Sequence, residues 1–412
     1  MKWIINDDVV LSQRPEGPLA AYVSSFAQWL SDQGYAVYSI YRSVLLAASF
    51  SQWLGRRAVR RRSISSEHSV HYLRCRYRQV RPQREDKPSL THFMEFLRGR
   101  RVIPVEKVPP CRTTPAEQCE KAFDRFLREE RGLATATVVN YVPFIRCFLK
   151  DRFANGQVRL SRLSCNDVVR FVQRQAPRLH VTRAKLLTTA LRSFLQYARY
   201  RGDITLDLAT AVPAVAKWSM TSIPRAIPAD QVRRLLASID RSTGIGRRDY
   251  AILLLLARLG LRAGEVVSLD LDDIDWEAGF LSIRGKSSRQ TQLPLLPEVG
   301  EAIVAYLKDG RPRCTNRRLF LRDDAPIRGF MGPSAIDCIV RRAINRAGVN
   351  TPAKGAHQFR HGLATEMLRH GASFAEIGEV LAHRSPETTK IYAKVDLEAL
   401  RPLALPWPGG AR

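Results

Sequence analysis

Residues 357–392 read HQFRHGLATEMLRHGASFAEIGEVLAHRSPETTKIY, and this stretch alternates helix signals with reactive side chains. His357 and Arg360 are three positions apart, which places both on one face at the start of a helix. Ser373 and Glu376 have the spacing of a capping box, in which a serine and an acid satisfy the first backbone N–H groups of a helix. The stretch therefore predicts at least two consecutive helices, the first of which carries a histidine and an arginine.

The end of this stretch adds a further histidine and a tyrosine. The second helix is expected to end near His383, and the segment Ser385-Pro386-Glu387 starts a short helix. Tyr392 lies in that short helix, nine residues beyond His383. Helices joined by such short turns pack together, so the histidine and the tyrosine are candidates for one site.

Upstream, a second polar group follows a buried helix. Residues 250–259 are almost continuously apolar and predict a buried helix that is broken at Gly260. Arg262 comes directly after this break, and Glu265 stands three residues further on, within helical reach of it. We interpret this pair as an arginine supported by a carboxylate.

A strand–turn–strand pattern follows the arginine. Residues 280–284 and 291–295 alternate apolar and polar side chains and predict two antiparallel strands. Lys286 lies in the turn at 285–288 and is a candidate catalytic residue. The fold class is therefore mainly α with a small antiparallel sheet in the C-terminal domain.

Proline-containing linkers divide the chain into three zones. Residues 1–110 form an Arg-rich helical region that is a candidate extra DNA-binding module. Residues 114–215 form a helical domain, and residues 225–412 form the α+β domain with its C-terminal tail. The arginines proposed to contact DNA in the first zone are Arg56, Arg57, Arg60, Arg61 and Arg62. A solvated charged face is the alternative interpretation of this cluster.

The first zone contains a sequence pattern that is similar to one in the second zone. Phe26-Ala-Gln-Trp-Leu30 followed by Gly34 resembles Phe123-Asp-Arg-Phe126-Leu127 followed by Gly132, and each then enters a helical run. A duplicated helical module and two unrelated amphipathic helices both explain the pattern, and the sequence leaves them open.

The composition limits the class of partner. The chain has 412 residues, with 66 Lys and Arg against 39 Asp and Glu, a formal net charge of +27. Such an excess favours a polyanion as partner, nucleic acid first and an anionic membrane second. No apolar run approaches the ~20 residues of a membrane span, and the N-terminus MKWIINDDVV lacks the apolar core of a signal peptide. We expect a cytoplasmic, nucleoid-associated protein with no membrane partner.

The cysteines and the polar residues narrow the chemistry. Seven cysteines with no CxxC pair argue against a disulfide framework or a zinc module. Arginines suit the non-bridging oxygens of a phosphate, lysine or histidine suits proton transfer, and tyrosine can form a covalent ester. No carboxylate cluster suggests a magnesium pair, so we expect no metal and no cofactor.

The C-terminal zone resembles the tyrosine recombinase (phage integrase) family. The resemblance is carried by Gly260-Leu261-Arg262-x-x-Glu265, the Gly285-Lys286 turn, His357-x-x-Arg360, Leu381-Ala382-His383 and Tyr392. Phe359 and Ala382 differ from the leucine and glycine common in the family. Residues 114–215 resemble the family's SAM-like core-binding domain by position and helix pattern, whereas residues 1–110 match nothing in the minimal family plan.

The resemblance implies a site-specific DNA recombinase of the integrase or transposase type, encoded by a mobile genetic element. It implies that Tyr392 attacks the scissile phosphate to form a 3′-phosphotyrosyl intermediate, without metal or ATP. It assigns the phosphate clamp to Arg262 and Arg360, leaving-group protonation to Lys286, and proton transfer and phosphate contacts to His357 and His383. Glu265 supports Arg262. The implied partner is double-stranded DNA bound by a homotetramer, with or without companion recombinases.

Two alternatives remain open. A type IB topoisomerase-like enzyme would use the same residues to nick and close DNA. A catalytically silent DNA-binding accessory protein of a mobile element would bind DNA without cutting it. His361 and His370 are expected to lie outside the site.

Overall fold

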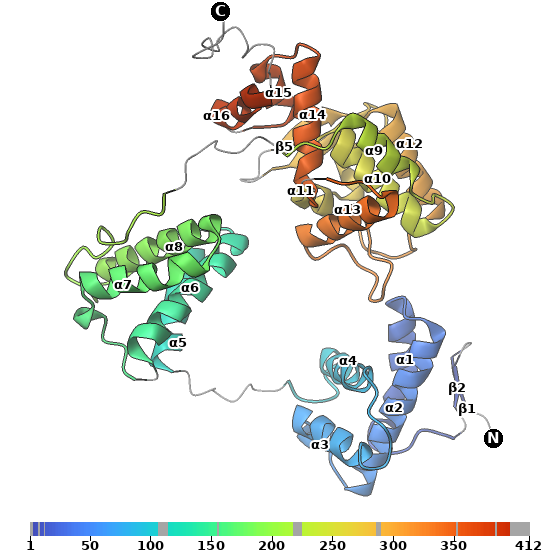
Figure 1. The fold of residues 1–412 in the computed structure, drawn as a ribbon. Coiled ribbons are helices and arrows are strands. Elements are labelled where there is room, and N and C mark those ends of the chain that lie inside the picture. The colour runs from blue at the N-terminus through green and yellow to red at the C-terminus, as the bar shows by residue number, and fades with distance from the viewer. Residues whose placement is uncertain are drawn as a thin grey trace, which may run out of the picture. The chain divides into compact units, whose positions relative to one another are not determined.

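A computed structural model describes residues 3–6, 9–11, 13–105, 114–154, 156–216, 225–285, 290–351, 353–383 and 385–395. The chain forms two compact units, one made of residues 1–106 with 222–412 and the other of residues 107–221. Among the described residues, no helix is both long and apolar enough to span a membrane. Three parts of the chain, each with its own hydrophobic core, follow one another along the sequence (Figure 1).

The first part is a group of four helices preceded by a small hairpin. Its elements are β1 (Trp3–Asn6), β2 (Val9–Leu11), the 3-10 turn η1 (Ala20–Tyr22), α1 (Val23–Asp32), α2 (Val37–Arg56), the 3-10 turn η2 (Arg61–Ser63), α3 (Ser66–Arg76) and α4 (Asp86–Gly99). The helices enclose an aromatic core in which Phe26, Phe50 and Phe93 are fully buried. The antiparallel hairpin was not expected, because its strands are only four and three residues long.

The second part is again a group of four helices. Its elements are α5 (Pro115–Arg125) with the π-helical turn η3 (Phe126–Glu130), α6 (Thr135–Phe153), η4 (Leu160–Arg162), α7 (Cys165–Gln175), η5 (Ala176–Arg178) and α8 (Val181–Tyr200). The first of these helices is α-helical to Arg125, and the turn that follows it, at 126–130, is π-helical. A capping box starts α7, where the side chains of Ser164 and Asp167 each accept from the other's backbone N–H group.

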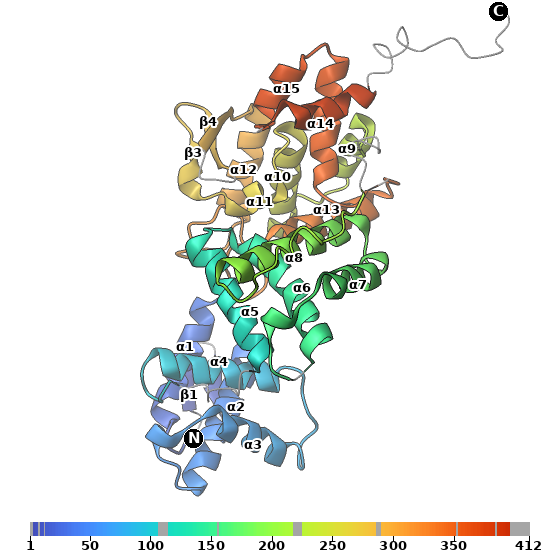
Figure 2. The ribbon, with the colours of Figure 1, turned by 90° about the vertical axis from the view of Figure 1, so that its left-hand side faces the viewer.

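The third part begins with helices around α10. Its first elements are α9 (Ala229–Ala237), α10 (Gly244–Arg258), α11 (Ala263–Ser268), η6 (Leu271–Asp273), β3 (Ile274–Asp275), β4 (Phe280–Arg284) and β5 (Gln290–Pro294). Residues 251–256 of α10 are all buried, as their apolar run predicts, and α10 contacts α9 and α11–α14 (Figure 2). The sheet is antiparallel in the order β3-β4-β5, with Leu281 paired to Leu293. Two of its three strands were expected.

The chain then returns to helices. These are α12 (Pro297–Asp309), α13 (Pro333–Ala347), α14 (His357–Arg369), α15 (Phe374–Val380), α16 (Pro386–Thr389) and the 3-10 turn η7 (Lys390–Val395). The last helices share a small core of their own, which consists of Ala364, Ile377, Leu381 and Tyr392. The predicted fold class, mainly α with a small antiparallel sheet in the C-terminal part, is confirmed.

Candidate active site

Arg262 is held at the start of α11 by the turn that precedes it. Gly260 adopts a left-handed φ of 60°, which favours glycine and lets the chain leave α10 sharply. Glu265, three residues into the new helix, accepts from Nη1 of Arg262 at 2.6 Å and from its backbone N–H at 2.8 Å. The carboxylate therefore caps the helix and fixes the guanidinium at the same time, as the three-residue spacing predicts.

Arg360 is buried on α14 and ties three segments together. Its Nη1 donates to the carbonyl of Gly260 at 2.8 Å, and its Nη2 donates to the carbonyl of Leu381. Burial, together with the nearby positive charge of Arg262, lowers the pKa of Arg360 to about 10. The guanidinium still carries its charge at neutral pH, so Arg262 and Arg360 make this region strongly cationic.

Tyr392 is almost fully buried, and its hydroxyl lies 3.0 Å from Nδ1 of His361. Burial raises the pKa of Tyr392, and the positive charges of Arg360 and Arg262 act in the opposite direction. The expectation that His361 lies outside the site is therefore wrong. A sequence signal existed, because His361 stands four residues after His357 and so shares its helix face. Their ring centroids lie 4.4 Å apart.

His383 is a further histidine whose ring lies close to that of Tyr392. Its ring is nearly parallel to that of Tyr392, with centroids 6.4 Å apart, and its Nδ1 lies 2.8 Å from Oγ1 of Thr389. Thr389 is buried and was not identified from the sequence, where a lone threonine in a short helix carries no signal. This contact orients the imidazole relative to the tyrosine.

All three histidines are neutral at neutral pH. Burial is the main cause that lowers the pKa of His361 to about 4 and of His383 to about 4, with further contributions from the surrounding positive groups. Burial, Arg360 and Arg262 also lower the pKa of His357, against which Asp337 acts weakly. A neutral imidazole has one donor and one acceptor nitrogen, so each ring can give or take a hydrogen bond here.

The structure thus brings most of the expected site residues together from α11, α14, η7 and the loop after α15. These are Arg262, Glu265, His357, Arg360, His383 and Tyr392, joined by His361. Lys286 lies outside the described residues, in the segment between β4 and β5. His370, at the end of α14, is exposed and bonds the carbonyl of Glu366, away from these groups as expected.

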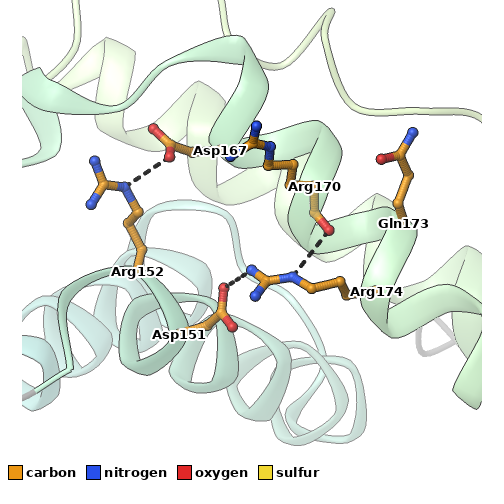
Figure 3. A pocket seen from close by; sticks show the side chains of 6 residues that line it. All are labelled: Asp151, Arg152, Asp167, Arg170, Gln173 and Arg174. Atoms are coloured by element: carbon orange, nitrogen blue, oxygen red, sulfur yellow. Dashed lines mark hydrogen bonds and ion pairs between the residues drawn. The ribbon is translucent and has the colours of Figure 1, made fainter.

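A separate hollow lies on the second part, between α6 and α7 (Figure 3). Four of its five charged side chains form two ion pairs: Arg152 with Asp167 at 3.0 Å, and Arg174 with Asp151 at 2.5 Å. These ion pairs brace the two helices. The described residues that line this hollow include no histidine or tyrosine, so the cationic tyrosine site is the candidate for chemistry.

The arrangement around Tyr392 suits an anionic substrate and a nucleophilic hydroxyl. Two guanidinium groups supply positive charge for the anion, and neutral imidazoles supply hydrogen bonds and a proton acceptor. In the described part of the chain, no three His, Cys, Asp or Glu side chains are grouped as metal ligands.

The chain is similar to known integrases and recombinases. The phage integrase family model matches residues 225–398, and the N-terminal SAM-like domain of phage integrases matches residues 121–202. The chain is 55% identical over its whole length to "Putative integrase/recombinase y4rA" of Sinorhizobium fredii, which it covers completely. It is 30% identical to the tyrosine recombinase XerD of Listeria monocytogenes, over 66% of this chain and 92% of that protein.

A solved structure shows the same fold. The XerH site-specific recombinase, bound to its palindromic difH substrate in a post-cleavage complex, is similar with a TM-score of 0.56 and 18% sequence identity. The similarity covers 73% of this chain and 98% of XerH.

Proposed function

Because the chain belongs to the phage integrase family of tyrosine recombinases, we propose that it is a site-specific DNA recombinase of the integrase or transposase type. The observation that carries the proposal is the placement of the Tyr392 hydroxyl beside neutral histidines and close enough to Arg262 and Arg360 for their positive charges to act on it. We assign residues 225–412 as the catalytic domain and 114–215 as the core-binding domain.

The proposed reaction is a transesterification on the DNA backbone. Oη of Tyr392 attacks the scissile phosphorus, the phosphorus–O5′ bond breaks, and a 3′-phosphotyrosyl ester forms. Arg262 and Arg360 neutralise the charge on the non-bridging oxygens, which is the main electrostatic demand of phosphoryl transfer. The ester keeps the bond energy, so a 5′-hydroxyl can reverse the step without ATP, and the arginines act where a metal ion otherwise would.

Proton transfer is assigned to the remaining groups. Lys286 gives a proton to the departing 5′ oxygen, while His357 and His383 bond the phosphate and assist proton transfer. Nδ1 of His361 lies 3.0 Å from the Tyr392 hydroxyl. We add His361 as the group that takes the tyrosine's proton during attack, in the tautomer whose Nδ1 is the acceptor. Glu265 acts through Arg262, which it orients.

The proposed partner is double-stranded DNA at specific sites. Exchange between two duplexes needs four strands to be cut, and each subunit contributes one Tyr392. Four subunits on DNA therefore complete one reaction, either as a homotetramer or together with companion recombinases.

Covalent capture in cells tests the proposal, because the captured DNA itself identifies the site. Wild type and Tyr392→Phe are expressed in parallel, non-covalent complexes are stripped with strong detergent, and the ends of protein-linked DNA are sequenced. We expect discrete ends with the wild type alone. Scattered ends at any sequence would indicate a nicking–closing activity like that of a type IB topoisomerase. Equal backgrounds from both proteins would overturn cleavage and leave a silent DNA-binding protein.

A further inference from the structure

The first and second parts of the chain have the same order of elements. Helices of 10, 20, 11 and 14 residues in the first part (α1–α4) match helices of 11, 19, 11 and 20 residues in the second (α5–α8). A 3-10 turn precedes the third helix in both. The packing pairs also match: first on second, second on third, second on fourth, and third on fourth helix.

Backbone landmarks fall at a nearly constant spacing. Gly34 and Gly132 follow the first helix with left-handed φ values of 79° and 57°, 98 positions apart. Ser65 and Ser164 each close a capping box at the start of the third helix, 99 positions apart. A left-handed glycine ends a helix, and a capping serine starts one. Their matching positions therefore indicate that the backbone follows the same path in both parts.

The aromatic cores correspond as well. The second helix contacts the third through Phe50 and Tyr72, with centroids 5.2 Å apart, and in the other part through Phe148 and Phe171, at 5.0 Å. These partners are 98 and 99 positions apart.

A second set of rings joins the first helix to the fourth. Phe26 lies 4.8 Å from Phe93, and Phe123 lies 5.3 Å from Phe194 in the other part. Contacts repeated between equivalent helices are not explained by amphipathicity alone, which fixes a face but not its partners.

We infer that residues 19–100 are a second copy of the SAM-like module at residues 115–200, and that this copy binds the phosphate backbone of duplex DNA. The SAM-like family model matches residues 121–202, which cover most of the second copy. The alternative of two unrelated amphipathic helices does not account for four matching helices and a matching core.

Both copies have a hollow along the third helix, but the arginines of the two hollows are paired differently. In the second copy, two ion pairs neutralise Arg152 and Arg174, two of the three arginines that line the hollow (Figure 3). Arg170, Gln173 and Arg174 line this hollow from the third helix. The residues 99 positions earlier, His71, Arg74 and Cys75, line the hollow of the first copy. Among the described residues no carboxylate forms an ion pair with Arg74, so this side chain has its charge available.

The surface around the first hollow is cationic. Between residues 56 and 84 the chain has ten arginines and one acid, Glu67. Nine of these arginines are exposed, namely Arg56, Arg57, Arg60, Arg61, Arg62, Arg74, Arg78, Arg81 and Arg84. They come from the end of α2, the turn η2 and α3 with the loop that follows it.

An arginine-rich surface of this kind needs closely spaced negative charges, which a duplex backbone supplies. Trp53 and Tyr22 hold two of the guanidinium groups, with Arg57 4.4 Å and Arg61 5.9 Å from the respective ring centroids. Ordered arginines lose less freedom on binding. Arg74 on α3 and Arg78 just beyond its end are exposed and suit phosphate contacts, which set affinity and register independently of base sequence.

The salt dependence of DNA binding by the full-length protein tests the inference. In one variant Arg60, Arg61, Arg62, Arg74 and Arg78 are changed to Gln, and in a matched control the same five are changed to Lys. Binding to a mixed-sequence duplex is measured over a range of salt concentrations, and thermal unfolding shows that each variant is folded. Each lost phosphate contact lowers the slope of log affinity against log salt by about 0.9.

We expect the Gln variant to lose about three to five units of this slope, while the Lys variant keeps the wild-type value. Equal slopes for all three proteins would overturn the inference. Loss of binding to phosphatidylserine vesicles in the Gln variant, with DNA binding unchanged, would assign the surface to a membrane and also overturn it.

These measurements do not require cleavage, so Tyr392→Phe gives the same slopes as the wild type. A protein that forms no covalent adduct but shows the arginine-dependent slope refutes the proposed function alone. A protein that forms adducts with an unchanged slope refutes this inference alone.

Discussion

Oγ1 of Thr389 lies 2.8 Å from Nδ1 of His383, and the threonine is buried within one helical turn of Tyr392, whose ring the histidine faces. The contact occupies one ring nitrogen and leaves Nε2 for a substrate. Thr389, which is absent from the family motifs, thus orients His383, which belongs to them.

Changing Thr389 to Val removes this contact with almost no change in side-chain shape. We expect adduct formation on the captured DNA site to fall about tenfold, equivalent to about 1.4 kcal/mol, because the imidazole loses its orienting partner. Single-turnover adduct rates measure the effect. Thr388→Val, at an exposed neighbouring position, is the control, and an equal loss in both variants would contradict the specific role of Thr389.

Glu265→Gln is expected to lower the adduct rate at least tenfold. The amide keeps an acceptor for the backbone N–H of Arg262 but loses the charge that holds its guanidinium. The matched control is Glu298→Gln, since Glu298 pairs with Arg258 at 2.6 Å with both side chains nearly half exposed. Exposed pairs contribute little, so an effect of similar size there would point to a general electrostatic cause.

Tyr392 has a packing role that is separable from its hydroxyl. Tyr392→Phe should abolish adducts while leaving thermal unfolding nearly unchanged, because the ring stays in the small core of α14 and α15. Tyr392→Ala should also destabilise that core by about 3–5 kcal/mol. Denaturant unfolding measures the difference, and equal stability of the two variants would show that the ring contributes no packing.

His361→Asn separates hydrogen bonding from proton transfer. Asn can place an oxygen near the position of Nδ1 but cannot take up a proton, so we expect the adduct rate to fall about 100-fold or more. His370→Asn, on the exposed end of the same helix, should behave as the wild type. An adduct rate in His361→Asn close to that of the wild type would reduce His361 to a positioning residue.

The stability of the protein should fall on acidification through the buried histidines. His361 and His383 have pKa values of about 4 in the folded protein, below the 6.5 of an unfolded histidine. Between these values the unfolded chain binds more protons, so stability is complete above about pH 6.5 and is lost as the pH falls toward 4. Denaturant midpoints should drop less steeply over this window in His361→Asn than in the wild type.

The sequence predicted the elements whose signals are local. Three such signals are the capping serine Ser373, the apolar run of α10, and the spacing of His357 and Arg360. Each depends on neighbours within a few residues, and the structure contains the corresponding helices. The short strand β3 and the N-terminal hairpin were missed because two to four residues are too few to show a period.

Contacts between residues far apart in the sequence could not be predicted. The position of Thr389 against His383 depends on how α16 packs, and the bond from Arg360 to Gly260 spans 100 positions. The repeat was visible in one helix at Phe26 and Phe123, but its decisive support is the pairing of these rings with the fourth helix. Local pairs such as Arg262 with Glu265 could therefore be predicted, whereas contacts between distant segments could not.

The nucleophile belongs to a separate small core made by the last helices, which has a consequence for synthesis. A chain emerges from the ribosome with its N-terminus first, and its earlier parts fold before the later ones are made. Both candidate DNA-binding modules and the arginine clamp precede α15 and η7 in the sequence. Under the proposed function, the nascent chain would therefore complete both DNA-binding modules before the hydroxyl that cuts DNA is added.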